Sequence, residues 1–497
     1  MTFRFAAAVL IMLLLVVVNT YVLINDYDRR LEDYHTNVKN QQQNLREIRT
    51  YSAGHYRIAR PPNPFSIFNV GLDKRLGNEI FITHAQVPTL WDASTYRTSN
   101  SLLNLFSSID IVFIFEVVLS LMALIFAYDT LAGEHEQGTL RLVLTHPVGR
   151  GYILLAKYFS AMISLLVPLL MSLILAVILL MTSAAISLNV DDFLRIGGIV
   201  ISSIVYLSVF YLIGMLISAA TRRTGTALML AMVVWGFWLF VYPNVILAMI
   251  APPQTSQAQM TSAYDQLKQI WEEFDRERKH FLATDPVPGE DPYFGLVGEG
   301  PNFGLRGGSG YNAAYFYQSP SILKYYYQSH SNIGRLKEES KPNVPFAQNY
   351  NRFLGQQTIE TAERAWLVRK QAFDSIFVKP AILERILLRF SPVGMYDAAT
   401  QAWAGTDLYG LRDFFEATRK YRRTLIDYFY DSDIFGSKQW FTGDGSVVDW
   451  DSLPQFTFQK SEIHINAKRA LPDLLLLLTM NLLLFTVIFI VFIRSEV

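Results

Sequence analysis

Six runs of apolar residues, each about as long as a membrane-crossing helix, alternate with polar segments along this chain. A helix needs about 20 mainly apolar residues to cross the hydrocarbon core of a bilayer. Within lipid, only helices and closed barrels satisfy every backbone polar group, so the pattern predicts six transmembrane helices. The predicted order is residues 1–25 (first span), 26–108 (polar segment), 109–128 (second span), 129–152 (connection), 153–183 (third span), 184–195 (short loop), 196–219 (fourth span), 220–226 (short loop), 227–250 (fifth span), 251–470 (polar segment) and 471–497 (sixth span and tail).

The first span could be mistaken for a signal peptide, because only Arg4 precedes a long apolar run. No small-residue cleavage site follows this run, so we expect an uncleaved anchor.

Basic residues in the short loops predict the orientation. The 129–152 connection carries Arg141 and Arg150, the 220–226 loop carries two arginines, and the tail carries Arg494. The 184–192 stretch has two acids and no Lys or Arg, although Arg195 follows it. Short loops rich in Lys and Arg stay in the cytoplasm, so both termini are expected in the cytosol and both long polar segments outside.

The two long polar segments are expected to form one mainly helical α+β extracytoplasmic domain resting on spans one, two, five and six. The first segment has a helical pattern over Tyr27–Ile48 and becomes turn-rich after Arg60-Pro-Pro-Asn-Pro64. Apolar and polar residues alternate on either side of Asp444-Gly445, which predicts a β-hairpin over Trp440–Gln459. Helical periodicity in the second segment covers Ser256–Leu282, Gln356–Phe377, Pro380–Phe390, Val393–Trp403 and Leu408–Tyr430.

Composition agrees with a membrane protein that carries a polar domain. Of 497 residues, 51% are hydrophobic and 17% are charged, and the formal net charge is zero. A neutral chain gives no reason to expect nucleic acid as a partner. The chain has no cysteine, which excludes disulfides, thiolate metal sites and cysteine nucleophiles.

The connection between spans two and three holds the most informative motif, YDTLAGEHEQGTLRLVLTHPVGRGYILLAK over residues 128–157. An acidic pair is followed by Gly-Thr-Leu, a basic residue, a proline and further basic residues. This order resembles the first cytosolic loop of ABC-2-type permeases. Further similarity to the DUF3526-containing branch of that family lies in Arg389-Phe-Ser-Pro-Val393, Ala404-Gly-Thr-Asp407, Phe414-Phe415 and Tyr421-Arg-Arg-Thr-Leu425.

The resemblance implies that this connection carries a coupling helix that docks on a separate ATP-binding subunit. The alternative from the residues alone is an interfacial helix lying on lipid headgroups. One departure is that only about four residues precede the first span, where family members often have an amphipathic elbow helix. The implied coupling residues are Asp129, Glu134, Glu136, Gly138, Thr139, Leu140, Arg141, Pro147 and Arg150.

The family further implies two ATP-binding subunits and a second permease, identical or paralogous, in contact with membrane lipid. The sequence has no G-x-x-x-x-G-K-[ST] phosphate loop, so ATP and magnesium are expected on the partner subunit and no cofactor in this chain. No G-x-S-x-G or H-E-x-x-H motif is present either, so we expect no enzyme activity in this chain.

Two further candidate sites are open to a structural explanation. Glu116 lies inside the second span, where an ionisable group is costly and often functional, although it could simply bond to a neighbouring span. Several tyrosines lie in a Gly-rich stretch, where they could line a ligand site, lie at the membrane interface or pack in the domain core. They are Tyr311, Tyr315, Tyr317, Tyr325, Tyr326 and Tyr327. The acids between Asp427 and Asp451 fit no EF-hand spacing, so no metal site is expected.

These observations predict the membrane subunit of an ABC-2-type transporter in a bacterial cytoplasmic membrane, with export as the default direction. One alternative is an ATP-driven mechanotransmitter that acts on an extracytoplasmic partner protein without moving a substrate. A membrane-anchored extracytoplasmic enzyme is a further alternative, although no catalytic motif supports it.

Overall fold

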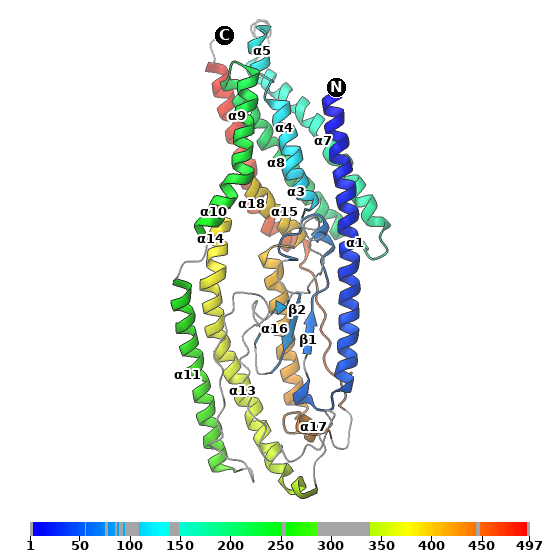
Figure 1. The fold of residues 1–497 in the computed structure, drawn as a ribbon, viewed down its shortest axis with the longest axis vertical. Helices are drawn as coiled ribbons and strands as arrows, with labels where there is room; N and C mark the ends of the chain where they lie inside the picture. The colour runs from blue at the N-terminus through cyan, green and yellow to red at the C-terminus, as the bar shows by residue number, and fades with distance from the viewer. Residues whose placement is uncertain are drawn as a thin grey trace.

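The chain folds into a helical membrane bundle with an additional polar domain at one end (Figure 1). The computed structural model describes residues 3–54, 56–74, 78–84, 87–88, 93–94, 109–139, 149–250, 255–286, 338–443 and 448–494. It contains six helices long and apolar enough to cross a membrane, as predicted. The N-terminal end of α1 and the C-terminal end of α18 lie at the same end of the bundle as the short helix α5, opposite the polar domain. We call this the connection end.

The spans extend further than the apolar runs indicated. They are formed by α1 (Phe3–Glu47), α3 and α4 (Ile111–Ile114 and Ser120–Ala127), α7 (Arg150–Thr182), α8 (Val190–Ala220), α9 and α10 (Thr224–Gly236 and Tyr242–Ile250) and α18 (Ile463–Arg494). One π turn interrupts span two at Phe115–Leu119 and another interrupts span five at Phe237–Val241. The helices extend beyond the predicted spans at five places, because α1 continues past residue 25 and α7, α8, α9 and α18 begin before 153, 196, 227 and 471.

The start of α8 shows why hydropathy placed this boundary too late. The Asn189 side chain accepts a hydrogen bond from the Asp192 N–H, while the Asp192 carboxylate accepts one from the Asn189 N–H, each at 3.1 Å. Such a capping box satisfies amide groups at a helix start whatever the polarity of the residues. The helix therefore begins in a polar stretch that a scan for apolar residues assigns to a loop.

The fourth span, α8, forms the centre of the bundle. It packs against α4, α7 and α18, and its most apolar stretch is 72% buried, compared with 11% in spans five and six. The first span packs mainly against α7. Spans five and six consequently leave most of their apolar surface available to lipid or to another membrane protein.

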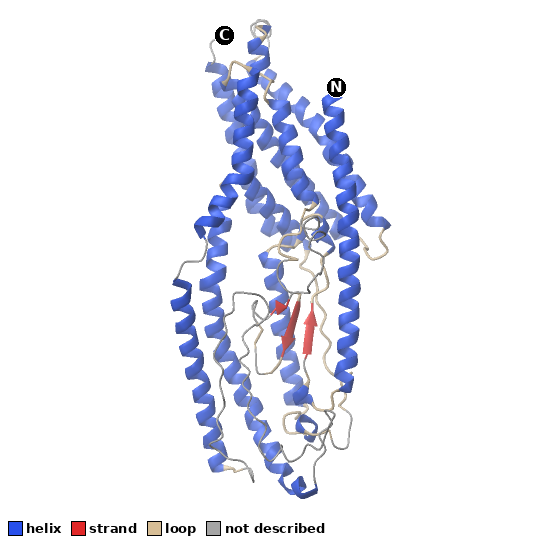
Figure 2. Ribbon diagram, in the orientation of Figure 1, coloured by secondary structure: helices blue, strands red, loops and turns tan. Residues whose placement is uncertain are grey.

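Helices dominate the polar domain, and a small sheet lies against them (Figure 2). Its helices include α11 (Thr255–Thr284), α13 (Val344–Phe373), α14 (Lys379–Leu388), α15 (Pro392–Ala404), α16 (Leu408–Asp431) and α17 (Lys438–Phe441). Its strands are β1 (Tyr56–Ala59), β2 (Glu79–Ile82) and β3 (Ala93–Ser94), antiparallel in the order β1-β2-β3.

Both polar segments contribute to one hydrophobic core, as predicted. Tyr56 and Ile80 from the first segment are buried with Trp271, Phe414 and Trp450 from the second. Rings meet across the two segments, since the centroids of Tyr56 and Trp450 are 6.0 Å apart. Both segments therefore contribute buried side chains to the same core, although four spans separate them along the chain.

The first segment is turn-rich after residue 60, as predicted, with a 3-10 turn at Pro64–Ile67 and turns over 71–74, and it also supplies the short strands β2 and β3. One expectation about strands was wrong. The hairpin expected over Trp440–Gln459 is absent from its described residues, since 438–441 form α17 and 448–459 contain no strand. Phe456 and Phe458 pack on Phe414 of α16 instead, so the alternation there reflects packing of an extended segment on a helix.

The junction between the domain and the bundle centres on α15, which packs between α8 and α18. The ring of Tyr396 stacks on Tyr206 of α8 with centroids 4.3 Å apart. A Cβ atom added at Gly198 of α8 would lie 2.3 Å from Trp403, so only glycine permits this approach. Span four was not among the spans expected to support the domain, and its contact with α15 corrects that expectation.

Candidate functional site

The connection end carries α5 (Ala132–Glu136), a short helix that contains both acids of the motif. The backbone N–H groups of Leu131 and Ala132 donate to Oγ of Ser218, at 3.0 and 2.9 Å. The first N–H groups of any helix lack partners within it, and here the end of α8 supplies one. The start of α5 is therefore fixed to the fourth span.

Glu134 is bonded to the third span. Lys157 of α7 donates from Nζ to Oε1 of Glu134 at 2.6 Å and to the carbonyl oxygen of Thr130 at 2.7 Å. Both side chains are largely covered, with 21% of Lys157 and 28% of Glu134 exposed. The other carboxylate oxygen of Glu134 is buried and has no hydrogen-bond partner in the described part of the chain. The structure thus gives Glu134 an internal role in holding α5 on α7.

Glu136 is bonded to the start of the fifth span. Its Oε2 accepts hydrogen bonds from the backbone N–H and the hydroxyl of Thr224, both at 2.8 Å. Thr224 is the first residue of α9, where a negative charge is favourable because unpaired N–H groups gather there. Glu136 therefore caps a neighbouring helix and joins the connection to span five.

Arg150 reaches the end of the sixth span. Its Nη1 donates to the carbonyl oxygens of Phe492 and Ile493, at 3.4 and 2.8 Å. Carbonyl groups in the last turn of a helix lack partners within it and favour a cation. Because Arg150 begins α7, this contact ties the third span to the end of α18.

Gly138 ends α5 in a left-handed conformation, with φ of 71°. A Cβ atom added there would meet no atom of a described residue within 4 Å. Thr139 folds back, and its hydroxyl donates to the carbonyl oxygen of Glu134 at 3.3 Å. Asp129 accepts from the backbone of Gly133 at 2.9 Å through its own carbonyl oxygen. The other predicted coupling residues, Leu140, Arg141 and Pro147, lie outside the described residues.

Sequence reasoning missed a polar cluster inside the bundle. The hydroxyl groups of Tyr158 and Ser208 are 2.7 Å apart, and Ser208 also donates to the amide oxygen of Asn481. Asn481 Nδ2 donates in turn to the carbonyl oxygen of Val205 at 3.0 Å. Side-chain hydrogen bonds of this kind join helices inside membranes. The signal was an asparagine within the apolar run of the sixth span.

Glu116 lies in the packed interior of span two, with 9% of the residue exposed. It falls in the π turn at Phe115–Leu119, and its carbonyl oxygen accepts a hydrogen bond from the Tyr206 hydroxyl at 3.0 Å. Tyr206 is also the residue that stacks on Tyr396 of α15. The structure therefore places Glu116 beside the junction with the polar domain. Its carboxylate forms no ion pair with a residue the structure describes.

The remaining sequence candidates yield no site in the described regions. All six tyrosines between Tyr311 and Tyr327 lie outside them. Among the residues described, no group of three or more His, Asp or Glu side chains could hold a metal ion.

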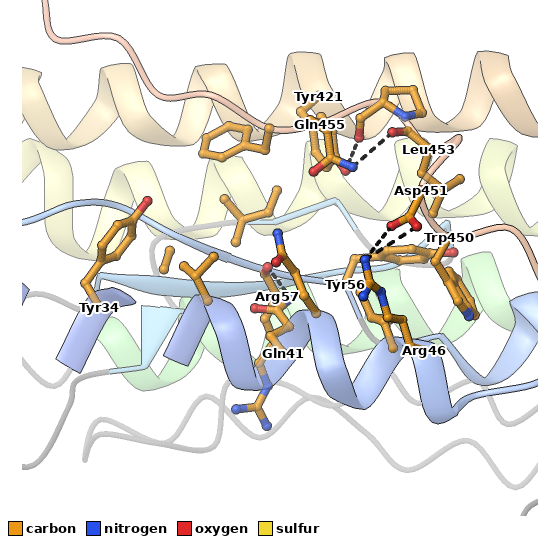
Figure 3. A pocket seen from close by; sticks show the side chains of 17 residues that line it. Tyr34, Gln41, Arg46, Tyr56, Arg57, Tyr421, Trp450, Asp451, Leu453 and Gln455 are labelled. Carbon is orange, nitrogen blue, oxygen red and sulfur yellow. Dashed lines mark hydrogen bonds and ion pairs between the residues drawn. The ribbon is translucent and has the colours of Figure 1, made fainter. Parts of the chain in front are cut away.

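A groove of about 180 Å³ opens on the polar domain between α1, β1 and residues 450–456 (Figure 3). Most of its polar groups already bond to one another. Arg46 pairs with Asp451 at 3.2 Å, and the Gln41 side-chain amide donates to the carbonyl oxygen of Arg57. The Gln455 side chain donates to the carbonyl oxygen of Leu453 at 3.3 Å. The contacts of Arg46 and Gln41 brace α1 against the domain core.

Comparison with known families agrees with the bundle and its connection. A family model described as ABC-2 family transporter protein matches residues 2–289, more than half of the chain. The chain belongs to the ABC-2 family of transporter proteins. A second model, for the domain of unknown function DUF3526, matches residues 324–459 of this ABC-2 protein and covers α13 to α17. The predicted family and its DUF3526 branch are thereby confirmed.

Two curated proteins resemble this ABC-2 protein over part of its length. The "Probable ABC transporter permease protein NosY" of Stutzerimonas stutzeri is 34% identical over 134 residues, which cover 27% of this chain and 48% of the relative. The protein of the same name from Pseudomonas aeruginosa is 31% identical over 140 residues, 28% of this chain and 50% of the relative. The chain thus spans about half the length of these relatives. No solved structure matches it.

Proposed function

We propose that this ABC-2 protein is the permease subunit of an ATP-driven transporter, and that α5 with the residues after it forms the contact with a separate ATP-binding subunit. The relatives named as ABC transporter permeases support this proposal. The connection end would face the cytosol, where ATP is available, and the polar domain would lie outside a bacterial cytoplasmic membrane. Two ATP-binding subunits and a second permease, identical or paralogous, would complete the assembly.

The observation that carries the proposal is the set of bonds between the second-to-third connection and the other spans. Glu134 binds α7, Glu136 binds α9 and Ser218 of α8 binds the start of α5. Packed helices move as rigid bodies between discrete arrangements, so a force on α5 would displace several spans together. Gly138 would present open backbone to the partner at the tip of this element.

A cross-linking experiment tests the contact directly. The chain has no native cysteine, so Gly138→Cys places one reactive thiol at the tip of α5. We expect this thiol to cross-link to the ATP-binding subunit in membranes, with a yield that changes when magnesium and ATP are added. Gly197→Cys is the matched control, because Gly197 also faces open space but lies on α8 near the polar domain. Equal yields from the two variants would refute the proposal.

Export of a substrate is the direction that we propose by default. A mechanotransmitter is the second candidate, and the insertion of α15 between α8 and α18 favours it, because motion of these spans would pass directly to the polar domain. Fluorophores at Gly225→Cys and Lys438→Cys would report on the distance between the connection end and the far part of the domain. A change on ATP binding supports transmission of motion to the domain, and a constant distance contradicts it.

A further inference from the structure

A small cavity lies where the polar domain meets the span bundle. Its volume is about 30 Å³, and four separate parts of the chain line it. Arg60 follows β1, Arg195 lies in the second turn of α8, Gly405 ends α15, and Lys460 precedes α18. The cavity is therefore next to the outermost turns of spans four and six.

Nitrogen donors converge on this cavity from three directions. A Cβ atom added at Gly405 would lie 3.2 Å from Nδ2 of Asn466, 3.6 Å from Nη1 of Arg195 and 3.8 Å from Nδ2 of Asn63. Gly405 has a φ of 68°, in the left-handed region that favours glycine, and its missing side chain keeps this point open. The two amide groups also hold α15, because they donate to the carbonyl oxygens of Trp403 and Ala404.

Two guanidinium groups at the cavity are buried without full pairing. Arg60 and Arg195 are each 5% exposed, and Nε of each is buried without a hydrogen-bond partner among described residues. Arg60 pairs with Asp73 and donates to the side chain of Asn78. Asp73 also pairs with Arg30, which has Asp26 as a second partner. Arg195 donates to the carbonyl oxygen of Ser461 and lies over the ring of Phe65, but no described carboxylate is within ion-pairing distance.

The acids around the cavity form no ion pair with Arg195 or Lys460 within the described part of the chain. Asp191 and Asp192 lie on the same helix as Arg195, and Asp407, beside Gly405, accepts a hydrogen bond from the backbone N–H of Gly410. Asp192 belongs to the capping box of α8. Asp413 binds Arg469 at 2.9 Å and accepts a hydrogen bond from the Ser461 hydroxyl. Lys460 adds a further cation at the rim and forms no ion pair within the described part of the chain. A buried charge is costly without a partner, so a further negative charge beside Arg195 would stabilise this cluster.

We propose that this cavity binds the oxygens of a phosphate group. Guanidinium groups recognise phosphate through paired hydrogen bonds. A volume of about 30 Å³ accommodates two water-sized atoms. Two phosphate oxygens would therefore occupy the cavity beside Arg195, and the remainder of the group would project past Lys460. The phosphate would come from a phospholipid headgroup, since the cavity adjoins the ends of two spans, or from free inorganic phosphate.

Thermal unfolding of the delipidated full-length chain in detergent tests this proposal. One series adds inorganic phosphate, a second adds short-chain phosphatidylglycerol, and a third adds sodium gluconate to match the ionic strength. We expect a saturable rise in the unfolding midpoint with phosphate or with the lipid, but not with gluconate. A response to the lipid alone identifies the headgroup as the ligand, and a response to inorganic phosphate identifies the free anion.

Substitutions assign the binding to the cavity. Lys460→Gln, at an exposed rim position, should weaken the apparent affinity about tenfold, as expected for loss of one charged hydrogen bond. Arg195→Gln should abolish the response, and Lys438→Gln, at an exposed position on α17, should leave it unchanged. The Lys460 variant decides the question even if the Arg195 variant fails to fold. The proposal is overturned by the absence of any saturable shift, or by the same affinity in wild type and Lys460→Gln.

Discussion

Nζ of Lys157 lies 2.6 Å from Oε1 of Glu134 and joins the connection between spans two and three to the body of span three. Both residues belong to the motif that resembles a coupling helix, yet the motif alone assigned Glu134 to a partner protein. The structure shows instead that one of its carboxylate oxygens is used within the chain. Effects of charge reversal at Glu134 therefore cannot be ascribed to a partner without a compensating change.

A charge swap separates the internal role of Glu134 from a role in docking. Glu134→Lys alone places two ammonium groups together in a partly buried site, and we expect ATPase activity of the assembled complex to fall. Loss of a partly buried charged pair costs about 1.5–3 kcal/mol. The double variant Glu134→Lys with Lys157→Glu should restore most of the activity, because the pair is rebuilt in reverse. Lys157→Glu alone is the control, because it also loses the hydrogen bond to the Thr130 carbonyl oxygen. A double variant no more active than either single variant would contradict the internal role of the pair.

Gly138 offers a sharper test of docking. Gly138→Trp should abolish co-purification of the ATP-binding subunit, because a large side chain would occupy the backbone surface proposed as the contact. Gly197→Trp is the matched control, since a Cβ atom at Gly197 also meets no described residue within 4 Å, but Gly197 lies on α8 near the polar domain. The left-handed backbone at Gly138 also matters, because its φ is 71°. Gly138→Ala should therefore destabilise the folded conformation of this turn by about 1–2 kcal/mol. Normal co-purification with Gly138→Trp would remove this loop from the interface.

The spans could be predicted from the sequence because lipid imposes a strict requirement on composition. Each apolar run had to be a helix, and all six were found. The boundaries were less predictable, since α1 and α18 continue beyond their apolar runs into polar sequence, where α1 packs on β1 and α18 packs on α15. Tertiary contacts of that kind leave no local signal in composition.

The candidate site was only partly predictable for a similar reason. The motif located α5, but Lys157 and Thr224 were not foreseen as partners of its acids, because they lie 23 and 88 positions away along the chain. The cavity beside Gly405 was missed entirely. Its residues come from four distant segments, and only the fold brings them together.

Two adjacent glycines in α8 test how the polar domain is held on the bundle. Gly198→Ala should force Trp403 away, since the new Cβ would lie 2.3 Å from its ring, and overpacking of this kind costs about 1–3 kcal/mol. Gly197→Ala should be neutral or slightly stabilising, because the new Cβ would meet no described residue within 4 Å and alanine favours a helix. Thermal unfolding of both variants in detergent makes the comparison. Equal midpoints would contradict the close packing of α15 on α8.

The last prediction concerns the stability of the polar domain in acid. Burial lowers the pKa of His84 from 6.5 to about 3, and the nearby positive charge of Arg422 contributes to this shift. Between these values the unfolded chain binds a proton that the folded chain does not, so stability falls as the pH drops, by up to about 1.4 kcal/mol per unit. His84→Gln should therefore flatten the pH dependence of the free energy of unfolding between about pH 6 and pH 4. His464→Gln is the control, because 69% of that side chain is exposed. Denaturant titrations of the three proteins at each pH give the slopes, and identical slopes for wild type and His84→Gln would show that His84 takes up its proton without unfolding the domain.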